Sequence, residues 1–286
     1  MELQDIVKPS TIEEALILKQ YLTNSLFLAG GTDLILKIRK NEIATKYLID
    51  LNIIDDLKVI SINELYIEIG SMVTFSEIRE NSIIKKYLNS LIECAQTMGS
   101  PQIRNMATIG GNIINASPSA DAIPCIMALN GVLVFKSSHT VRNITCVDYF
   151  KNYSIEKVKE NELLTKILIP KKNILSGFYK LGKRNSLAIA RLSASIVLDK
   201  ENDLIKNISI ALGAVSRYPF RVNKIEDLSK DRSIAWLFED EILTMLEYEV
   251  IESIKGRKTM NFKKEAIKGV YKNALQRTVA LVKNER

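Results

Sequence analysis

Apolar and polar positions near the N-terminus predict a helix, followed by two buried strands with a second helix between them. Ser10 and Thr11 are each followed three residues later by a glutamate, as a capping box at a helix start requires. Apolar residues then recur at helical spacing over residues 15–22. The runs LFLAGG (26–31) and KYLIDLN (46–52) are typical of buried strands. Between them, Leu34, Ile35 and Ile38 lie on one side of a helix-like stretch. We therefore expect a compact βαβ-like unit that ends near residues 55–56.

The middle of the chain is rich in predicted strands. YIEIGS (66–71), GVLVFKS (131–137) and LLTKILIP (163–170) have the apolar, β-branched composition of strands. Residues 74–100 are helical in pattern, with a break near Asn81 and Ser82. The small-residue stretch 104–124 carries apolar residues at intervals, and we expect it to be a loop that is buried or covered by a ligand.

A third region begins near residue 176. Residues 190–215 predict a β-hairpin with its turn at Lys200–Asp203. Beyond Pro219, residues 233–251 and 262–282 carry apolar side chains three to four positions apart, which predicts helices. We expect Trp236 to lie in the core of a helical bundle.

Composition excludes several classes of protein. Of 286 residues, 47% are apolar and 26% charged, and no apolar run approaches the ~20 residues of a membrane-spanning helix. The N-terminus lacks the apolar core of a secretory signal. Cys94, Cys125 and Cys146 form no CxxC pair, so neither zinc nor an iron–sulfur cluster is indicated on this chain. Reduced thiols in a cytoplasmic protein are the simplest interpretation.

The net charge of +7 and the pI near 9.1 raise the possibility of nucleic-acid binding. However, the lysines are scattered and interleaved with glutamates, and no aromatic RNA-binding motif is present. A solvated, lysine-coated surface explains the charge, with an acidic partner protein as the alternative. The one histidine, His139, lies in a polar turn, so we expect it to be exposed and without an acid–base role.

Glycine-rich turns are candidate phosphate sites because bare backbone can approach an anion closely. The dinucleotide fingerprint GxGxxG is absent at Gly30 and Gly31. Residues 177–184 fit GxxxxGK, but Arg184 stands where a P-loop has Ser or Thr to hold magnesium. The alternation there is that of a strand, so we do not expect a P-loop.

Two small-residue segments, Ala29–Asp33 and Thr108–Asp121, could hold opposite ends of one extended ligand. The second offers backbone N–H groups at Gly110 and Gly111. It also offers polar side chains, and a carboxylate such as Asp121 suits ligand hydroxyls better than phosphate. These polar residues are Thr108, Asn112, Asn115, Ser117, Ser119 and Asp121. The pattern predicts a dinucleotide held without a Rossmann fold.

These segments also carry a family resemblance. AGGTDL (29–34) together with IRNMATIGGNIINASPSADAIP (103–124) resembles the FAD-binding subunit of molybdenum hydroxylases, the xanthine dehydrogenase and carbon monoxide dehydrogenase type. Pro9–Leu16 resembles the family's opening P-x-S-x-E-E-A-L, and Ile208–Arg221 resembles the start of its C-terminal domain. The likeness extends over nearly the whole chain.

The resemblance implies an α+β fold. It consists of a two-subdomain FAD-binding fold of the vanillyl-alcohol oxidase type and a C-terminal domain with a three-stranded antiparallel sheet and a helical bundle. We expect FAD-binding subdomain 1 at residues 1–55, subdomain 2 at 56–175 and the C-terminal domain at 176–286.

The resemblance also implies a set of cofactor-binding residues. Leu28 to Leu34 would wrap the FAD pyrophosphate, and Asp121 would meet a ribityl hydroxyl or act as a helix N-cap. Lys180 would lie near the flavin ring, where a cation stabilises reduced flavin, or would be a solvated strand lysine. The full set is Leu28, Ala29, Gly30, Gly31, Thr32, Asp33, Leu34, Thr108, Gly110, Gly111, Asn112, Asn115, Asp121, Leu163 and Lys180. No residue of this chain is assigned a catalytic or metal-binding role.

The implied function is electron transfer within a complex. A molybdopterin-binding large subunit would oxidise the substrate, and a small subunit with [2Fe–2S] clusters would pass electrons to this chain's FAD. NAD⁺ is a possible acceptor, although Ala188 replaces an aspartate that the family often has on the nicotinamide side. Two alternatives are a stand-alone FAD-dependent oxidoreductase of the same fold and a scaffold or nucleic-acid-binding module without flavin.

Overall fold

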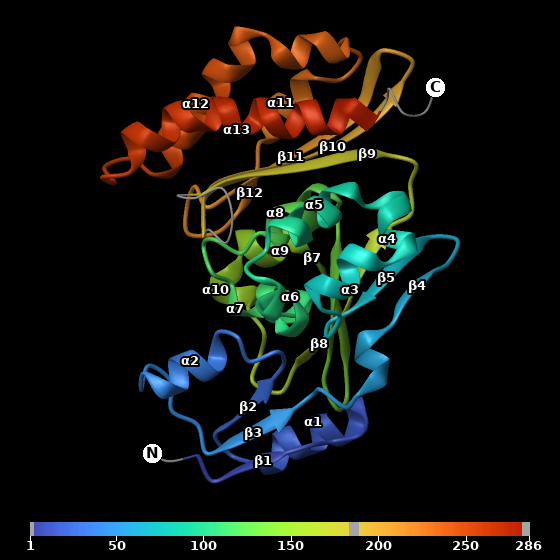
Figure 1. Ribbon diagram of the computed structural model, residues 1–286, viewed down its shortest axis with the longest axis vertical. Coiled ribbons are helices and arrows are strands. Elements are labelled where there is room, and N and C mark those ends of the chain that lie inside the picture. The colour runs from blue at the N-terminus through green and yellow to red at the C-terminus, as the bar shows by residue number, and fades with distance from the viewer. Residues whose placement is uncertain (1–2, 183–188, 282–286) are drawn as a thin grey trace.

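The computed structural model describes residues 3–182 and 189–281. Figure 1 shows an elongated molecule in which the N-terminal section lies at one end and the C-terminal helices lie at the other. Three separate β-sheets follow one another along the chain. Within the described residues, no helix is both long enough and apolar enough to cross a membrane.

The first sheet is parallel, with strand order β1-β3-β2. The side-chain oxygen of Thr11 accepts a hydrogen bond from the Glu14 backbone N–H at 3.1 Å, so the predicted helix start is confirmed. The βαβ connection runs from β2 through α2 to β3, as the pattern predicts. The elements are β1 (Asp5–Val7), α1 (Ile12–Tyr21), β2 (Ser25–Leu28), α2 (Leu34–Arg39), β3 (Tyr47–Asp50) and the 3₁₀ helix η1 (Asp55–Lys58).

The second sheet is antiparallel, with strand order β4-β5-β8-β6-β7. The three strands predicted in the middle of the chain are present as β5, β6 and β8. The strands are β4 (Ile60–Ile62), β5 (Tyr66–Gly70), β6 (Val132–Lys136), β7 (Val141–Thr145) and β8 (Leu163–Pro170).

Helices pack around this second sheet. Asn81 ends α3 and its side chain accepts the Ile83 backbone N–H at 2.9 Å to begin α4, which confirms the predicted break. The helices are α3 (Phe75–Glu80), α4 (Ser82–Tyr87), α5 (Asn89–Thr97), α6 (Pro101–Met106), α7 (Ile109–Asn115), α8 (Ala122–Ala128), α9 (Cys146–Lys151) and α10 (Tyr153–Glu156).

The expectation of a loop over residues 104–124 is wrong for most of that stretch, which contains the end of α6, all of α7 and the start of α8. Residues Ile109–Asn115 form α7, although two adjacent glycines disfavour a helix. The Thr108 hydroxyl caps this helix by accepting the Gly111 backbone N–H at 3.0 Å, and Ile109 and Ile113 are fully buried. Capping and tertiary burial together therefore outweigh the low helix propensity of glycine.

The third sheet is antiparallel, with strand order β12-β11-β10-β9. The predicted hairpin is confirmed as β10 and β11, joined at Asn202 and Asp203. The short strand β12 pairs over only two residues, so it adds a fourth strand to the three that were expected. The elements are β9 (Leu175–Gly182), β10 (Ala190–Glu201), β11 (Leu204–Gly213), β12 (Phe220–Arg221), α11 (Asn223–Leu228), η2 (Ile234–Phe238), α12 (Asp240–Ser253) and α13 (Met260–Ala280).

The third sheet lies between two layers of helices, as Figure 1 shows. On one face it packs against α13, and the shared core includes Trp236 as predicted. On the other face α5 and α8 pack against it, and Phe178, Val197 and Ala211 belong to the core of the second section. Burial on both faces ties the C-terminal section to the rest of the chain.

Helix α5 runs beside the edge strand β9. The Phe178 backbone N–H donates to the Glu93 carboxylate at 2.6 Å, and the Lys180 ammonium group donates to the Thr97 carbonyl at 2.8 Å. Two residues of a strand advance about 7 Å and one helical turn about 5.4 Å, so alternate strand residues meet successive turns of α5. The helix therefore protects an edge that would otherwise be free to pair.

Candidate functional site

The two glycine-containing segments touch each other although they are far apart in the sequence. A Cβ atom on Gly30 would lie 1.7 Å from the Met106 carbonyl oxygen, and one on Gly111 would lie 3.8 Å from the Ala29 Cβ. Gly31 has a φ of +70°, a conformation that residues with a side chain rarely adopt. Close approach and backbone conformation therefore explain why glycine stands at positions 30 and 31.

A cavity of about 660 Å³ opens beside this contact. Its volume falls in the range of about 300–1,000 Å³ that is typical of ligand sites. Most of the residues expected to bind a cofactor line it. They are Ala29, Gly30, Gly31, Thr32, Asp33, Leu34, Thr108, Gly110, Gly111, Asn112, Asn115 and Leu163.

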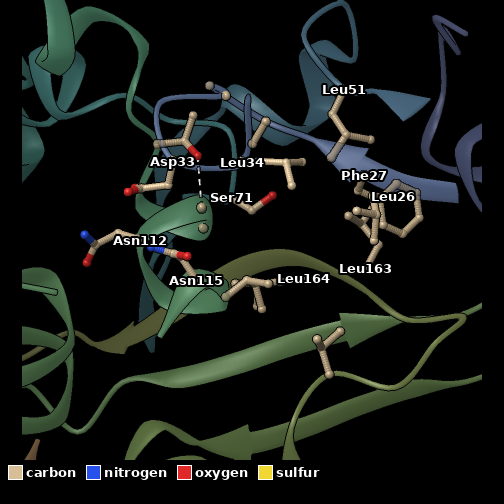
Figure 2. Close-up of a pocket in the computed structure, with 18 of the residues that line it drawn as sticks. Leu26, Phe27, Asp33, Leu34, Leu51, Ser71, Asn112, Asn115, Leu163 and Leu164 are labelled. Atoms are coloured by element: carbon tan, nitrogen blue, oxygen red, sulfur yellow. Dashed lines mark hydrogen bonds between the residues drawn. The ribbon is translucent and has the colours of Figure 1, made fainter. Parts of the chain in front are cut away.

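The cavity has an apolar end and a polar end. Figure 2 shows Leu26, Phe27 and Leu163 gathered on one side, with side chains from β2 and the start of β8. Asp33 and Asn112 lie on the other side, near the glycine segments. The apolar end suits a flat ring, and the polar end suits phosphate and hydroxyl groups.

The first glycine segment offers unused backbone donors. Among the hydrogen bonds of the described residues, none uses the backbone N–H of Gly30, Gly31 or Thr32. Backbone N–H groups at the wall of a cavity must be satisfied by water or by a ligand. Successive N–H groups of this kind form an anion-binding concavity.

In the second segment, the backbone N–H groups of Gly110 and Gly111 are not free for a ligand, which differs from the sequence-based prediction. The Gly110 N–H donates to the Ser71 carbonyl at 2.9 Å, and the Gly111 N–H donates to the Thr108 hydroxyl. Both donors are therefore already bonded within the protein, because capping and packing of α7 use them. The polar side chains of this segment that line the cavity are those of Thr108, Asn112 and Asn115.

Lysines contribute positive charge to the cavity. The Lys37 ammonium group donates to the Asn115 side-chain oxygen at 2.6 Å, across the cavity wall from α2 to α7. Lys19 donates to the Ser25 carbonyl at 2.5 Å; burial lowers its pKa, and the charge of Glu160 opposes this shift only in part. Sequence reasoning missed both lysines. For Lys37 a signal was available, since it lies one helical turn after Asp33.

Three expected site residues, Leu28, Asp121 and Lys180, are not part of the cavity lining. Asp121 and Lys180 form an ion pair with 2.6 Å between carboxylate and ammonium, and their side chains are only 4% and 7% exposed. Burial raises the pKa of Asp121, and the charge and hydrogen bond of Lys180 oppose that shift without cancelling it. The alternative of a solvated strand lysine at position 180 is therefore wrong, because β9 is covered by α5.

Asp121 does not act as the helix cap that the sequence suggested. It stands just before α8, yet its carboxylate makes no capping hydrogen bond. The Asn112 side-chain oxygen instead accepts the Ala122 backbone N–H at 3.3 Å. The second carboxylate oxygen of Asp121 is buried and has no hydrogen-bond partner among the described residues.

The cysteines, the histidine and the described part of the GxxxxGK stretch lie as the sequence predicts. Cys94, Cys125 and Cys146 are buried free thiols, and His139 is exposed, as predicted. Residues 177–182 belong to strand β9, which is consistent with the rejection of a P-loop there. Ala188, which replaces the aspartate that the family often has on the nicotinamide side, lies outside the described residues.

Comparison with known proteins places this geometry in a family. Residues 1–172 match the FAD binding domain in molybdopterin dehydrogenase, and residues 177–278 match the CO dehydrogenase flavoprotein C-terminal domain. The nicotinate dehydrogenase FAD-subunit of Eubacterium barkeri is 29% identical over 92% of both chains. The carbon monoxide dehydrogenase medium chain of Afipia carboxidovorans is 26% identical over 98% of both.

Solved structures agree on the fold. A chain of reconstituted CO dehydrogenase from Oligotropha carboxidovorans superposes with a TM-score of 0.89 at 23% identity, with 98% of each chain covered. The two family matches together span most of the chain in the order that the sequence motifs predict. The protein therefore belongs to the family of FAD-binding subunits of molybdenum hydroxylases and is a subunit of an oxidoreductase.

Proposed function

We propose that this chain binds FAD in the cavity between its glycine segments and transfers electrons within a molybdenum hydroxylase complex. The observation that carries the proposal is the cavity itself. It joins unused backbone donors at Gly30, Gly31 and Thr32 to an apolar end at Phe27 and Leu163. A dinucleotide has both a diphosphate and a flat ring, so one ligand can satisfy both ends.

The residues fit this cofactor in distinct ways. The segment from Leu28 to Leu34 would hold the diphosphate with its backbone N–H groups. Thr108, Asn112 and Asn115 would face the ribityl and diphosphate side, and the apolar end would hold a ring of the ligand. Bound FAD would supply the redox chemistry, receiving electrons from [2Fe–2S] clusters on a small subunit and passing them to NAD⁺ or another acceptor.

Asp121 and Lys180 would act beside the cavity. Their buried ion pair leaves one carboxylate oxygen of Asp121 without a partner, and such an atom can accept a hydrogen bond from a ligand hydroxyl. We retain the interpretation that Asp121 meets the ribityl chain and that Lys180 supplies positive charge near the flavin.

The proposal extends to partners and domains. Molybdopterin would lie on a large partner subunit and the [2Fe–2S] clusters on a small one. Within the described residues, no group of three or more His, Cys, Asp or Glu side chains is placed to hold a metal ion. The chain would divide into FAD-binding subdomains at 1–55 and 56–175, of the vanillyl-alcohol oxidase type, and a C-terminal domain at 176–286. The division follows the three sheets, one in each part.

Absorbance of the purified full chain tests the cofactor. A bound flavin gives bands near ~450 nm, and bleaching by NADH without oxygen would identify a nicotinamide acceptor. Bands without bleaching would indicate another acceptor or a site completed by partner chains. A colourless chain that fails to take up added FAD would contradict the proposal. Full turnover of a substrate by the isolated chain would favour a stand-alone oxidoreductase instead.

A further inference from the structure

Lys37 occupies an unusual position in the cavity wall. Its ammonium group reaches from α2 to the Asn115 side chain on α7, 78 residues later, at 2.6 Å. Both residues line the cavity and both are half-buried. Figure 2 shows Asn115 facing the cavity near the polar end. The bond therefore joins the two segments that enclose the candidate diphosphate site.

The charge of Lys37 is not neutralised within the protein. Among the described residues, no carboxylate lies within ion-pair distance of its ammonium group. By contrast, the cavity-lining Glu162 pairs with Arg142 at 2.6 Å. A half-buried cation with only a neutral amide oxygen as its partner favours binding of an anion.

The groups around the Lys37 ammonium group favour a diphosphate as the bound anion. Lys37 follows the glycine segment by one helical turn, so its charge adds to the unused N–H groups of Gly30 and Gly31. The Lys37 ammonium group is attracted more strongly to a negatively charged phosphate oxygen than to the neutral amide oxygen of Asn115. A phosphate oxygen can therefore displace the Asn115 amide oxygen from Lys37.

We propose that Lys37 recognises the diphosphate of the dinucleotide and that its bond to Asn115 holds it in place until the ligand binds. This inference rests on the proposed function. When Lys37 turns to the phosphate, the Asn115 side chain becomes free to bond the ligand's hydroxyl groups. Lys37 is thus a specificity residue for dinucleotides over ligands that lack phosphate.

Affinity measurements with three ligands test this role. The full chain, freed of flavin, is titrated with FAD, ADP and riboflavin at two salt concentrations. Lys37→Met should weaken FAD and ADP binding by roughly 10- to 100-fold, since hydrogen bonds to charged groups contribute about 1.5–3 kcal/mol. Riboflavin affinity should be unchanged, and the salt dependence of FAD binding should become shallower.

Two further variants serve as controls. Lys37→Arg keeps the charge and should retain most of the FAD affinity. Lys40→Met removes an exposed lysine at the end of the same helix, outside the cavity lining, and should change nothing. A urea unfolding curve of each variant reports whether the fold is intact.

The outcomes separate this inference from the proposed function. If wild-type protein binds FAD and Lys37→Met binds it equally well, the role of Lys37 is refuted while the proposed function stands. If Lys37→Met weakens riboflavin binding as much as FAD binding, the Lys37–Asn115 hydrogen bond only stabilises the fold and the inference fails. If the wild-type chain binds no FAD, the proposed function fails and this inference with it.

Discussion

Replacing Gly30 with alanine is the most direct test of how the site is built. The added Cβ would lie 1.7 Å from the Met106 carbonyl oxygen and 2.6 Å from its carbonyl carbon. Real Cβ atoms do not approach other heavy atoms closer than about 3 Å. One of the two backbone segments must therefore move by more than about 1 Å.

The cost of this movement follows from what is displaced. The obstructing atoms belong to the backbone at the end of α6, so no flexible side chain can rotate away. Overpacking of this kind costs about 1–3 kcal/mol of unfolding free energy. A shift of about 1 Å also separates the N–H groups of the Ala29–Asp33 segment from the diphosphate, and we expect FAD affinity to fall at least 10-fold.

Urea unfolding and FAD titration of the Gly30→Ala protein measure both effects. The matched control is Gly269→Ala, because a Cβ at Gly269 meets no atom within 4 Å. Gly269 lies inside α13, so this control should gain about 0.5–1 kcal/mol of stability from helix propensity and keep its FAD affinity. A Gly30→Ala protein with wild-type stability and wild-type affinity would refute the close-approach argument.

Three more predictions concern stability. Lys180→Met leaves the buried Asp121 carboxylate without its partner and should cost about 3–5 kcal/mol in urea unfolding. Adding Asp121→Leu should recover most of that loss, and no recovery would contradict the ion-pair assignment. Burial raises the pKa of Glu162, but the hydrogen bond and charge of Arg142 outweigh it, so the pKa is lowered in the folded state. The stability that this pair adds is therefore present above the unfolded pKa of about 4 and is lost as pH falls through the folded pKa. The difference between wild type and Glu162→Gln should shrink on acidification, and a pH-independent difference would oppose this assignment. Gly177→Ala places a Cβ 2.6–2.8 Å from atoms of α13 and should cost about 1–3 kcal/mol; an unchanged unfolding midpoint would show that α13 can shift freely.

Local pattern was sufficient for many elements of this fold. The Thr11 cap, the break at Asn81 and the hairpin turn at Asn202 each depend on residues within four positions of one another. Such short-range features are determined by side-chain hydrogen bonding and backbone conformation, which a sequence reveals directly. The presence of two glycine segments was likewise visible in the sequence.

Only the tertiary structure decided how the site is assembled. Helix α7 forms despite its two glycines because packing buries Ile109 and Ile113. The N–H groups of Gly110 and Gly111, which the sequence had offered to a ligand, are bonded within the protein. Lys37 meets Asn115 across 78 residues, and Lys180 meets Asp121 across 59. No periodicity connects positions so far apart, because their contact depends on how complete sheets and helices pack. The sequence by itself thus determined the locally encoded elements and indicated a dinucleotide as ligand, whereas packing determined how the second glycine segment folds and which backbone donors remain free.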